Sequence, residues 1–244
     1  MNIFIMKKIF LLMVLLLPFT IDSYGKDHDE PVRHEEHEYV DLGLPSGTLW
    51  ATCNVGANSP EEHGGHFAWG ETETKESYFP SNYKWGEGLQ SMTKYITNFI
   101  VHYHRIPRID HPYRGYVDNK TELEPEDDAA TVNWGPQWQT PTKVQLDELQ
   151  KRCTWYMAII NGVTGYLVRG PNGNAIFLPA SGRSQGKTCY GGPFGDYWSR
   201  MINPEEPFWA YHISFNIRWN KVYMGTTEFR AYGASVRAVR VSQN

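Results

Sequence analysis

Short apolar segments separated by Gly, Pro and Asn turns follow one another along most of this chain. Segments of this length between turn residues are typical of β-strands. In the turn Pro171-Asn172-Gly173, for example, the glycine can adopt the positive φ that a hairpin between 165–169 and 174–178 requires. The sequence predicts strands at 38–42, 48–55, 65–69, 155–160, 165–169, 174–178, 196–199, 208–215, 219–224 and 233–241.

One segment with a clear helix signal begins at Thr142 and runs to Cys153. Thr142 and Gln145 have the spacing of a capping box, in which the side chain of each residue accepts a hydrogen bond from the backbone N–H of the other. Leu146 and Leu149 then form an apolar stripe that we expect to be buried. The pattern predicts a helix over this range.

A second helical segment is expected from Asp127 to Trp134. Asp127 and Asp128 favour a helix start because acidic side chains cap the first turn and interact with its positive end. Residues 71–124 have no clear periodicity. Two main helices among many short strands predict an α+β fold rather than alternating βαβ units.

The first 25 residues have the organisation of a secretory signal peptide. Lys7 and Lys8 precede the apolar run Ile9–Phe19, and small residues lead to a cleavage position near Gly25. The run is shorter than the ~20 residues of a spanning helix. A buried N-terminal helix is disfavoured, because two lysines before an apolar block are hard to place in a core. We expect a secreted, periplasmic or cell-envelope protein without a transmembrane segment after cleavage.

The expected mature chain has a charged start and a single domain. Residues 26–37 lack apolar periodicity and predict a flexible lead-in. Residues 38–244 have the length of one domain. The formal net charge is −4 with no basic stripe, which argues against nucleic acid as a partner. Aromatic residues make up 14% of the chain and lie mostly in apolar segments, which favours a core role over sugar stacking.

The three cysteines, Cys53, Cys153 and Cys189, allow at most one intramolecular bridge. Cys53 shares the apolar face of a predicted strand, and Cys153 continues the Leu146 and Leu149 stripe of the helix expected at 142–153, so we expect both to be buried. A Cys53–Cys153 bridge is the preferred pairing in an oxidising compartment. Two free buried thiols are the open alternative.

Ten sequence words occur in order between residues 38 and 241. They are Glu38–Ala57, Phe67–Thr72, Asp118–Lys120, Leu123–Ala130, Trp138–Thr142, Cys153–Trp155, Gly170–Gly173, Ile176–Ala180, Gly195–Ser199 and Ser235–Arg237. In content and order they resemble the secreted paralogous-domain family named after Fibrobacter succinogenes, whose members resemble C-type-lectin-like domains. The resemblance implies a lectin-like architecture, a location outside the cytoplasm and a binding role.

The arrangement is also similar to that of formylglycine-generating enzymes, which work through two cysteines close in sequence. Here Cys189 lies 36 positions from Cys153, so that pair is absent. A Ser/His/Asp set stays open, because such residues need only meet in space. No nucleophile elbow occurs. We expect a non-catalytic protein without a cofactor; the alternatives are a hydrolase or oxidase on this scaffold, or a structural envelope component.

Two groups of residues have metal-binding side chains. Carboxylates of Glu124, Glu126, Asp127 and Asp128 are candidate Ca²⁺ ligands, although helix capping by the aspartates is the favoured interpretation. Among the histidines, a flexible charged tail or loop is favoured over Zn²⁺ or Cu²⁺ binding. They are His28, His34, His37, His63, His66, His102 and His104.

The segment between Trp85 and Asp118 falls between the family words, which suggests a variable insertion at about 86–117. Its stretch 95–116 is rich in Tyr, His and Arg, the residue types that dominate binding hot spots. Packing of this insertion onto the domain is an equally weighted alternative. The candidate ligand-binding residues, for a glycan or another surface protein, are Tyr103, His104, Arg105, Tyr113, Arg114 and Tyr116.

Overall fold

The computed structural model describes residues 37–88, 91–103 and 109–240. The expected signal peptide at 1–25 and nearly all of the expected lead-in at 26–37 lie outside the described residues. His37 is described, and its ring stacks on Trp134 with the ring centroids 3.9 Å apart. The last four residues, 241–244, are also outside the described part.

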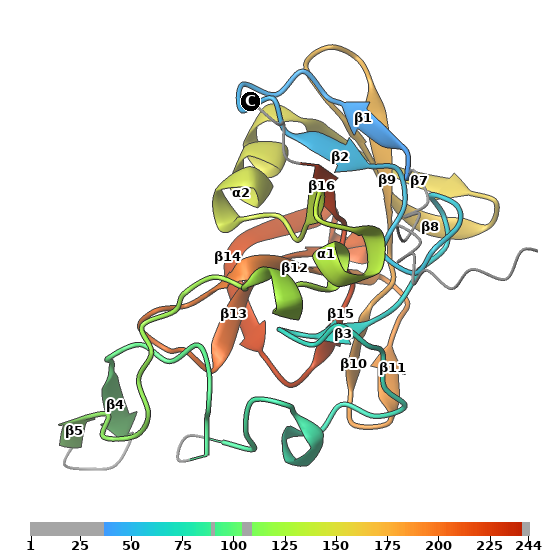
Figure 1. Cartoon of the computed structure of the whole chain (residues 1–244). Coiled ribbons are helices and arrows are strands. Elements are labelled where there is room, and N and C mark those ends of the chain that lie inside the picture. Colours follow the sequence, from blue (N-terminus) through green and yellow to red (C-terminus); the bar gives the residue numbers. More distant parts are fainter. Residues whose placement is uncertain (1–36, 89–90, 104–108, 241–244) are drawn as a thin grey trace, which may run out of the picture. The chain divides into compact units, whose positions relative to one another are not determined.

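Antiparallel strands dominate the fold, since 37% of the described residues lie in strands and 13% in helices (Figure 1). The sheet that holds both early and late strands comprises β1 (Tyr39–Asp41), β2 (Leu49–Ala51), β16 (Val239–Arg240) and β6 (Trp138–Gln139). A second comprises β11 (Thr188–Tyr190), β10 (Arg183–Gln185), β15 (Gly233–Ala234) and β3 (Phe67–Ala68). The remaining sheets are β12 (Phe194–Ile202) with β13 (Trp209–Asn216) and β14 (Lys221–Phe229), β7 (Thr154–Ile160) with β8 (Val163–Arg169) and β9 (Ala175–Pro179), and the pair β4 (Ile100–Tyr103) and β5 (Ile109–Pro112).

Segments far apart in the sequence are paired in two of these sheets. Val239 of β16 lies opposite Trp50 on one side and Gln139 on the other. Strand β15 likewise lies between β10 and β3. Strands from the last part of the described chain therefore pair with strands from its first part. Figure 1 shows this for red β16 beside blue β2.

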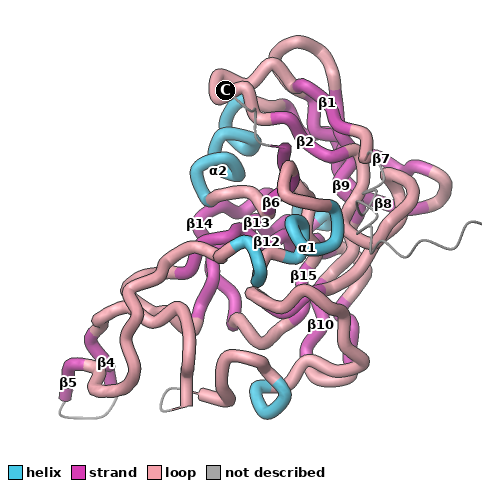
Figure 2. Tube along the Cα trace, viewed as in Figure 1, coloured by secondary structure: helices cyan, strands magenta, loops and turns pink. Residues whose placement is uncertain are grey.

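Both expected α-helices are present, and each is shorter than expected (Figure 2). Helix α2 (Lys143–Arg152) follows the capping box of Thr142 and Gln145, which is confirmed, and packs on the β12–β13–β14 sheet. Helix α1 (Ala129–Trp134) has Asp128 as its N-cap, which accepts a hydrogen bond from the Ala130 backbone N–H. The 3-10 helices within the described ranges are η1 (Pro80–Asn82), η2 (Pro125–Asp127) and η3 (Ile217–Trp219).

The predicted α+β class with two main helices is wrong. Of the described helices only α2 reaches seven residues, and the fold is mostly antiparallel β. Helix α1 has six residues because Asp127 belongs to the preceding 3-10 turn and Gly135, with φ of 95°, ends the helix. The expected end at Trp134 is correct; the expected start is wrong because two adjacent aspartates can both cap a helix, and here Asp128 is the N-cap while Asp127 lies in the 3-10 turn.

Large aromatic residues fill the interior, as expected from their positions in apolar segments. One cluster surrounds Trp69 and Trp198, a second surrounds Trp50 and Tyr166, and a third surrounds Ile96. The third cluster includes residues from the insertion, so part of the insertion is core. No helix in the described ranges has the length and apolar character needed to cross a membrane.

The preferred Cys53–Cys153 bridge is not formed, because all three cysteines are free thiols. Cys53 is buried in the first cluster, and its thiol donates to the Ala57 carbonyl at 3.3 Å. Cys153 packs, partly buried, against the second cluster. The two thiols thus face different parts of the core. Both are free, as in the open alternative, but the expectation of burial holds for Cys53 only, because Cys153 is half-buried.

Candidate functional site

The candidate residues at 95–116 do not form one described surface. His104 and Arg105 lie outside the described residues, and Tyr103 is the last residue of β4. Arg114 is exposed, and Tyr116 is 54% exposed. Tyr113 is buried, and its ring stacks on Phe99 with the centroids 4.7 Å apart. Tyr113 is therefore a packing residue, whereas Arg114 and Tyr116, which follow it, are exposed.

The insertion is fixed at its base by Asp118. The two carboxylate oxygens of Asp118 accept hydrogen bonds from the backbone N–H groups of Tyr95 and Ile96, each at 2.8 Å. The backbone N–H of Asp118 in turn donates to the Ile96 carbonyl. These contacts join Tyr95 and Ile96, inside the insertion, to the residue that follows the insertion, 23 and 22 positions later. The hairpin β4–β5, which lies away from the other sheets in Figure 1, begins a few residues further on.

Tyr95 holds this base in an unusual backbone conformation. Its φ is 62°, the left-handed region that non-glycine residues seldom adopt, and its side chain is fully buried. The Tyr95 hydroxyl donates to the Asp127 carboxylate at 2.7 Å and accepts from the Glu124 backbone N–H at 3.0 Å. The guanidinium of Arg230 also donates to the Tyr95 carbonyl. These contacts hold both the side chain and the backbone of Tyr95, and such contacts are what allow a strained backbone conformation to persist.

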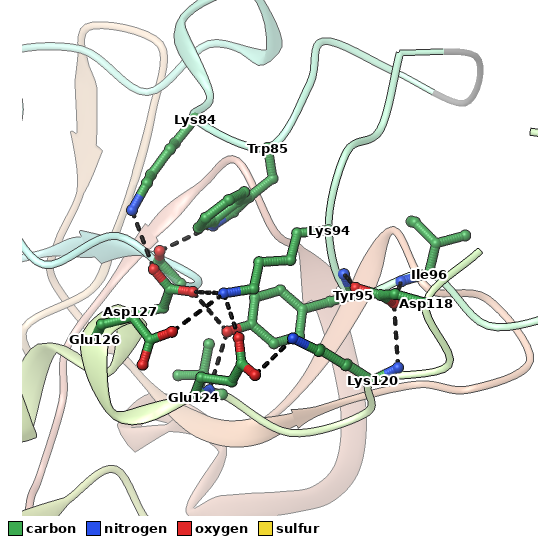
Figure 3. A network of polar contacts seen from close by, with 12 residues as sticks. Lys84, Trp85, Lys94, Tyr95, Ile96, Asp118, Lys120, Glu124, Glu126 and Asp127 are labelled. Atoms are coloured by element: carbon green, nitrogen blue, oxygen red, sulfur yellow. Dashed lines mark hydrogen bonds and ion pairs between the residues drawn. The ribbon is translucent and has the colours of Figure 1, made fainter. Parts of the chain in front are cut away.

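The predicted acidic cluster exists, but a lysine lies at its centre (Figure 3). Carboxylate oxygens of Glu124, Glu126 and Asp127 lie within 4.8 Å of one another. The Nζ of Lys94 is 2.5 Å from Glu124, 2.6 Å from Asp127 and 3.7 Å from Glu126. Asp128 is not part of the group, because its carboxylate faces Thr140, accepting from the Thr140 backbone and hydroxyl.

Further cations and aromatic rings complete this network. Lys84 and Lys120 contact Asp127 and Glu124 at 3.1 and 2.6 Å. The ring of Trp85 lies 4.3 Å from the Lys84 ammonium and 5.2 Å from the Lys94 ammonium, within cation–π range. Three lysines therefore balance the three carboxylates, and the position that a metal ion would occupy holds an ammonium group.

The electrostatics of the network follow from these contacts. Hydrogen bonds from Lys120 and Lys94 lower the pKa of Glu124 to about 2. Burial acts to raise the pKa of Asp127, but hydrogen bonds from Lys94, Tyr95 and Lys84 outweigh it, and the net shift is downward. Burial similarly opposes the charge of Lys94, yet its carboxylate partners raise its pKa overall. The cluster is a set of satisfied ion pairs, a structural arrangement at the base of the insertion.

A serine and a histidine meet elsewhere in the fold, which bears on the enzymatic alternative. Nδ1 of His66 lies 2.8 Å from Oγ of Ser184. A catalytic base also needs its second ring nitrogen held by an acceptor, and the buried Nε2 of His66 has no hydrogen-bond partner. The nearby carboxylate of Asp196 lies 3.4 Å from His212. Burial lowers the pKa of His66. The contact between Ser184 and His66 is therefore a structural hydrogen bond that joins β10 to the residue before β3.

A pocket that the sequence analysis missed lies beside the β10–β11 hairpin. It has a volume of about 330 Å³ and is lined by Tyr78, Phe79, Pro80, Gln185, Gly186, Lys187, Thr188, Tyr190 and Tyr232. Phe79 is 42% exposed and Tyr190 is 49% exposed, so two aromatic side chains at this pocket are open to solvent. In the sequence, the signal for this pocket is Tyr190, an aromatic residue in a short segment bounded by Gly186 and Gly191.

A scan against protein-family models finds no match to this chain, and searches of curated proteins and of solved structures find no match either.

Proposed function

We propose that this chain is a non-catalytic binding protein that acts in the cell envelope or outside the cell and recognises another surface protein through its insertion. The proposed surface consists of the β4–β5 hairpin together with Arg114 and Tyr116. The single observation that carries the proposal is the contrast between a fixed base and an exposed outer part. Loops held on a rigid scaffold are common recognition elements.

The contacts around the base support this contrast. Asp118 joins the chain that leads into β4 to the chain that follows β5, and the stacked rings of Phe99 and Tyr113 anchor the chain just before β4 and just after β5. Beyond them Ile100 is 53% exposed and Tyr116 is 54% exposed. Such a base lets the outer residues vary without disturbing the core.

A protein partner is favoured over a glycan for this surface. In the described part of the chain, β4 and β5 pair only with each other, so each has a free edge that another strand can join. Exposed Ile100 adds apolar area at one of these edges. Tyr113, which was a candidate for sugar stacking, is buried and unavailable. The sequence resemblance to the secreted paralogous-domain family supports a binding role in general, although membership of a family does not fix a function.

The test uses a variant in which residues 101–111 are replaced by Asn-Gly. A two-residue turn suits the pair formed by Ile100 and Pro112, and the anchoring rings of Phe99 and Tyr113 are kept. Labelled protein is applied to intact cells of the producing organism, untreated, treated with protease, or oxidised with periodate to destroy glycans. We expect binding to be lost after proteolysis and in the trimmed variant, and to survive periodate.

The control is Tyr156→Ala, which removes a similarly exposed aromatic residue from β7. Equal binding by the trimmed and intact proteins would contradict the proposed surface. Binding that survives proteolysis but not periodate would indicate a glycan ligand instead. The location is tested separately by N-terminal sequencing of exported protein, for which we expect a start near Lys26; an uncleaved chain recovered from the cytoplasm would contradict it.

A further inference from the structure

The pocket beside the β10–β11 hairpin has a construction that suits a ligand. Residues on adjacent strands alternate between faces, and the register pairs Gln185 with Thr188 and Arg183 with Tyr190. Gln185, Thr188 and Tyr190 therefore share the face that lines the pocket, while Cys189 lies on the other face, where its thiol contacts the Ser181 carbonyl. The volume of about 330 Å³ is within the usual range for small-molecule pockets, roughly 300–1,000 Å³.

The opposite wall is held in place by backbone pairing. Tyr78 and Gly186 exchange two backbone hydrogen bonds, of 2.7 and 2.8 Å. Gly186 has a φ of 60°, and a Cβ there would lie only 3.0 Å from the Phe79 ring. The glycine thus allows both the tight turn and the close approach of Phe79. The ring of Phe79 and the hairpin are consequently positioned relative to each other before any ligand binds.

Polar groups in the pocket are available to a ligand. The Gln185 amide Nε2 donates to the Tyr232 hydroxyl at 2.6 Å, which fixes both side chains. Within the described residues, no other hydrogen bond engages the Gln185 carbonyl oxygen or the Tyr232 hydroxyl proton. Thr188 adds an exposed hydroxyl, and exposed Lys187 forms no ion pair in the described part of the chain.

We propose that this pocket binds a saccharide that carries a negatively charged group. Exposed aromatic side chains can pack against the apolar C–H face of a sugar ring. The Gln185 amide and the hydroxyls of Thr188 and Tyr232 can form hydrogen bonds with the hydroxyl groups of the sugar. The unpaired ammonium of Lys187 favours an anionic substituent over a neutral sugar. The inference concerns a site separate from the insertion and does not rest on the protein partner proposed for it.

The test is an array of neutral, carboxylated and sulfated oligosaccharides, followed by titration with the retained compound. Carboxylated and sulfated sugars share the required charge, and the array shows which one is bound. We expect an anionic saccharide to be retained more strongly than its neutral counterpart. An array on which no saccharide is retained, or only neutral ones, would overturn the proposal.

Variants then locate the binding. Tyr190→Ala and, as a second variant, Phe79→Ala should each weaken binding about tenfold, the loss expected for one aromatic stacking contact. Lys187→Gln should weaken binding of the anionic saccharide by about two- to fivefold and reduce its salt dependence. Tyr156→Ala and Lys221→Gln, at exposed residues outside the pocket, are the matched controls and should stay within about twofold.

The variant with residues 101–111 replaced should retain the saccharide, so that failure of the proposed insertion surface and failure of the pocket can be told apart. Equal saccharide affinity in Tyr190→Ala and Tyr156→Ala would overturn the assignment to this pocket.

Discussion

The Nζ atom of Lys94 lies 2.6 Å from Oδ2 of Asp127, whose side chain is only 2% exposed. The same ammonium contacts Glu124, and the backbone carbonyl of Lys94 accepts from buried Arg230. Lys94 therefore joins the first part of the insertion to the 3-10 turn before α1. The Lys94 ammonium therefore affects stability in two ways: it compensates the charge of the buried Asp127 carboxylate, and it ties the insertion to the turn before α1.

Lys94→Met should lower the free energy of unfolding by about 1–3 kcal/mol. Removing one partner of a buried ion pair costs about 3–5 kcal/mol, but Asp127 keeps its hydrogen bonds from Lys84 and Tyr95. Urea unfolding measures the change. The matched control is Lys151→Met, because Lys151 is 69% exposed on α2 and should change stability by less than about 0.5 kcal/mol. Equal stabilities of the two variants would show that Lys94 is dispensable.

The same network predicts a dependence on acid. The folded pKa of Glu124 is about 2, below its ordinary value of 4.5, and the pKa of Asp127 is also lowered. Groups with lowered pKa values stabilise the fold above the ordinary pKa and lose that contribution as the pH falls through the folded pKa. The difference in melting temperature between the intact protein and Lys94→Met should therefore shrink between pH 4.5 and about pH 2.

Comparing the two proteins is necessary because other groups also titrate in this range. Burial raises the pKa of Asp128, so its protonation works in the opposite direction. Asp128 is present in both proteins and its contribution cancels in the difference. A difference that stays constant, or grows, as the pH is lowered would contradict the role given to the carboxylates of Glu124 and Asp127.

Arg237 is a buried cation that connects several segments of the fold. Its side chain is 1% exposed, and it donates to the side-chain oxygen of Asn54 and to the carbonyls of Ala51, Thr52 and Phe177. Burial lowers its pKa. The planar guanidinium serves acceptors from β2, the following turn and β9 at once, and a lysine cannot reproduce that geometry.

Arg237→Lys should accordingly reduce the free energy of unfolding by about 2–4 kcal/mol, since buried carbonyl groups lose their donors. Arg152→Lys, at an exposed position at the end of α2, serves as the control and should change stability by less than about 0.5 kcal/mol. Chemical unfolding at neutral pH gives both values. A loss no larger than that of the control would mean that water or a rearranged side chain replaces the lost hydrogen bonds.

Local signals in the sequence gave correct predictions. The capping box of Thr142 and Gln145, the N-cap at Asp128 and the strands around the Pro171–Gly173 turn depend on residues within a few positions of one another. The fold class was wrong because the first helix begins only after the 3-10 turn that contains Asp127, and because several strands, among them β4, β5, β10 and β11, form without a local apolar pattern.

Features made by distant residues were not predictable in this way. Lys94 and Asp127 are 33 positions apart, and no pattern connects them. The pocket combines Phe79, Tyr190 and Tyr232, which meet only because β10 pairs with β15 and because Tyr78 bonds to Gly186. Strands β10 and β11 themselves escaped prediction, since their stability comes from pairing rather than from an apolar pattern.

The thiols provide the last prediction. Under denaturing, non-reducing conditions three thiols should react, because Cys53, Cys153 and Cys189 are all free. In the native protein at pH 8 only the exposed Cys189 should react quickly. Burial raises the pKa of Cys153 to about 11 and also raises that of Cys53, so both are protonated, and the thiolate is the reactive form.

Kinetics with a thiol reagent separate these cases. Cys189→Ser should abolish the fast phase and leave two thiols that react only on unfolding, whereas Cys153→Ser should leave the fast phase unchanged. A single reactive thiol in the denatured protein would mean that two cysteines are bridged.

Oxidation of the protein tests the core itself. Because Cys53 and Cys153 face different core clusters, a disulfide between them would require one of these clusters to open. Appearance of a bridge on oxidation would therefore report local opening of the core, and its absence after prolonged oxidation would show that the clusters stay closed.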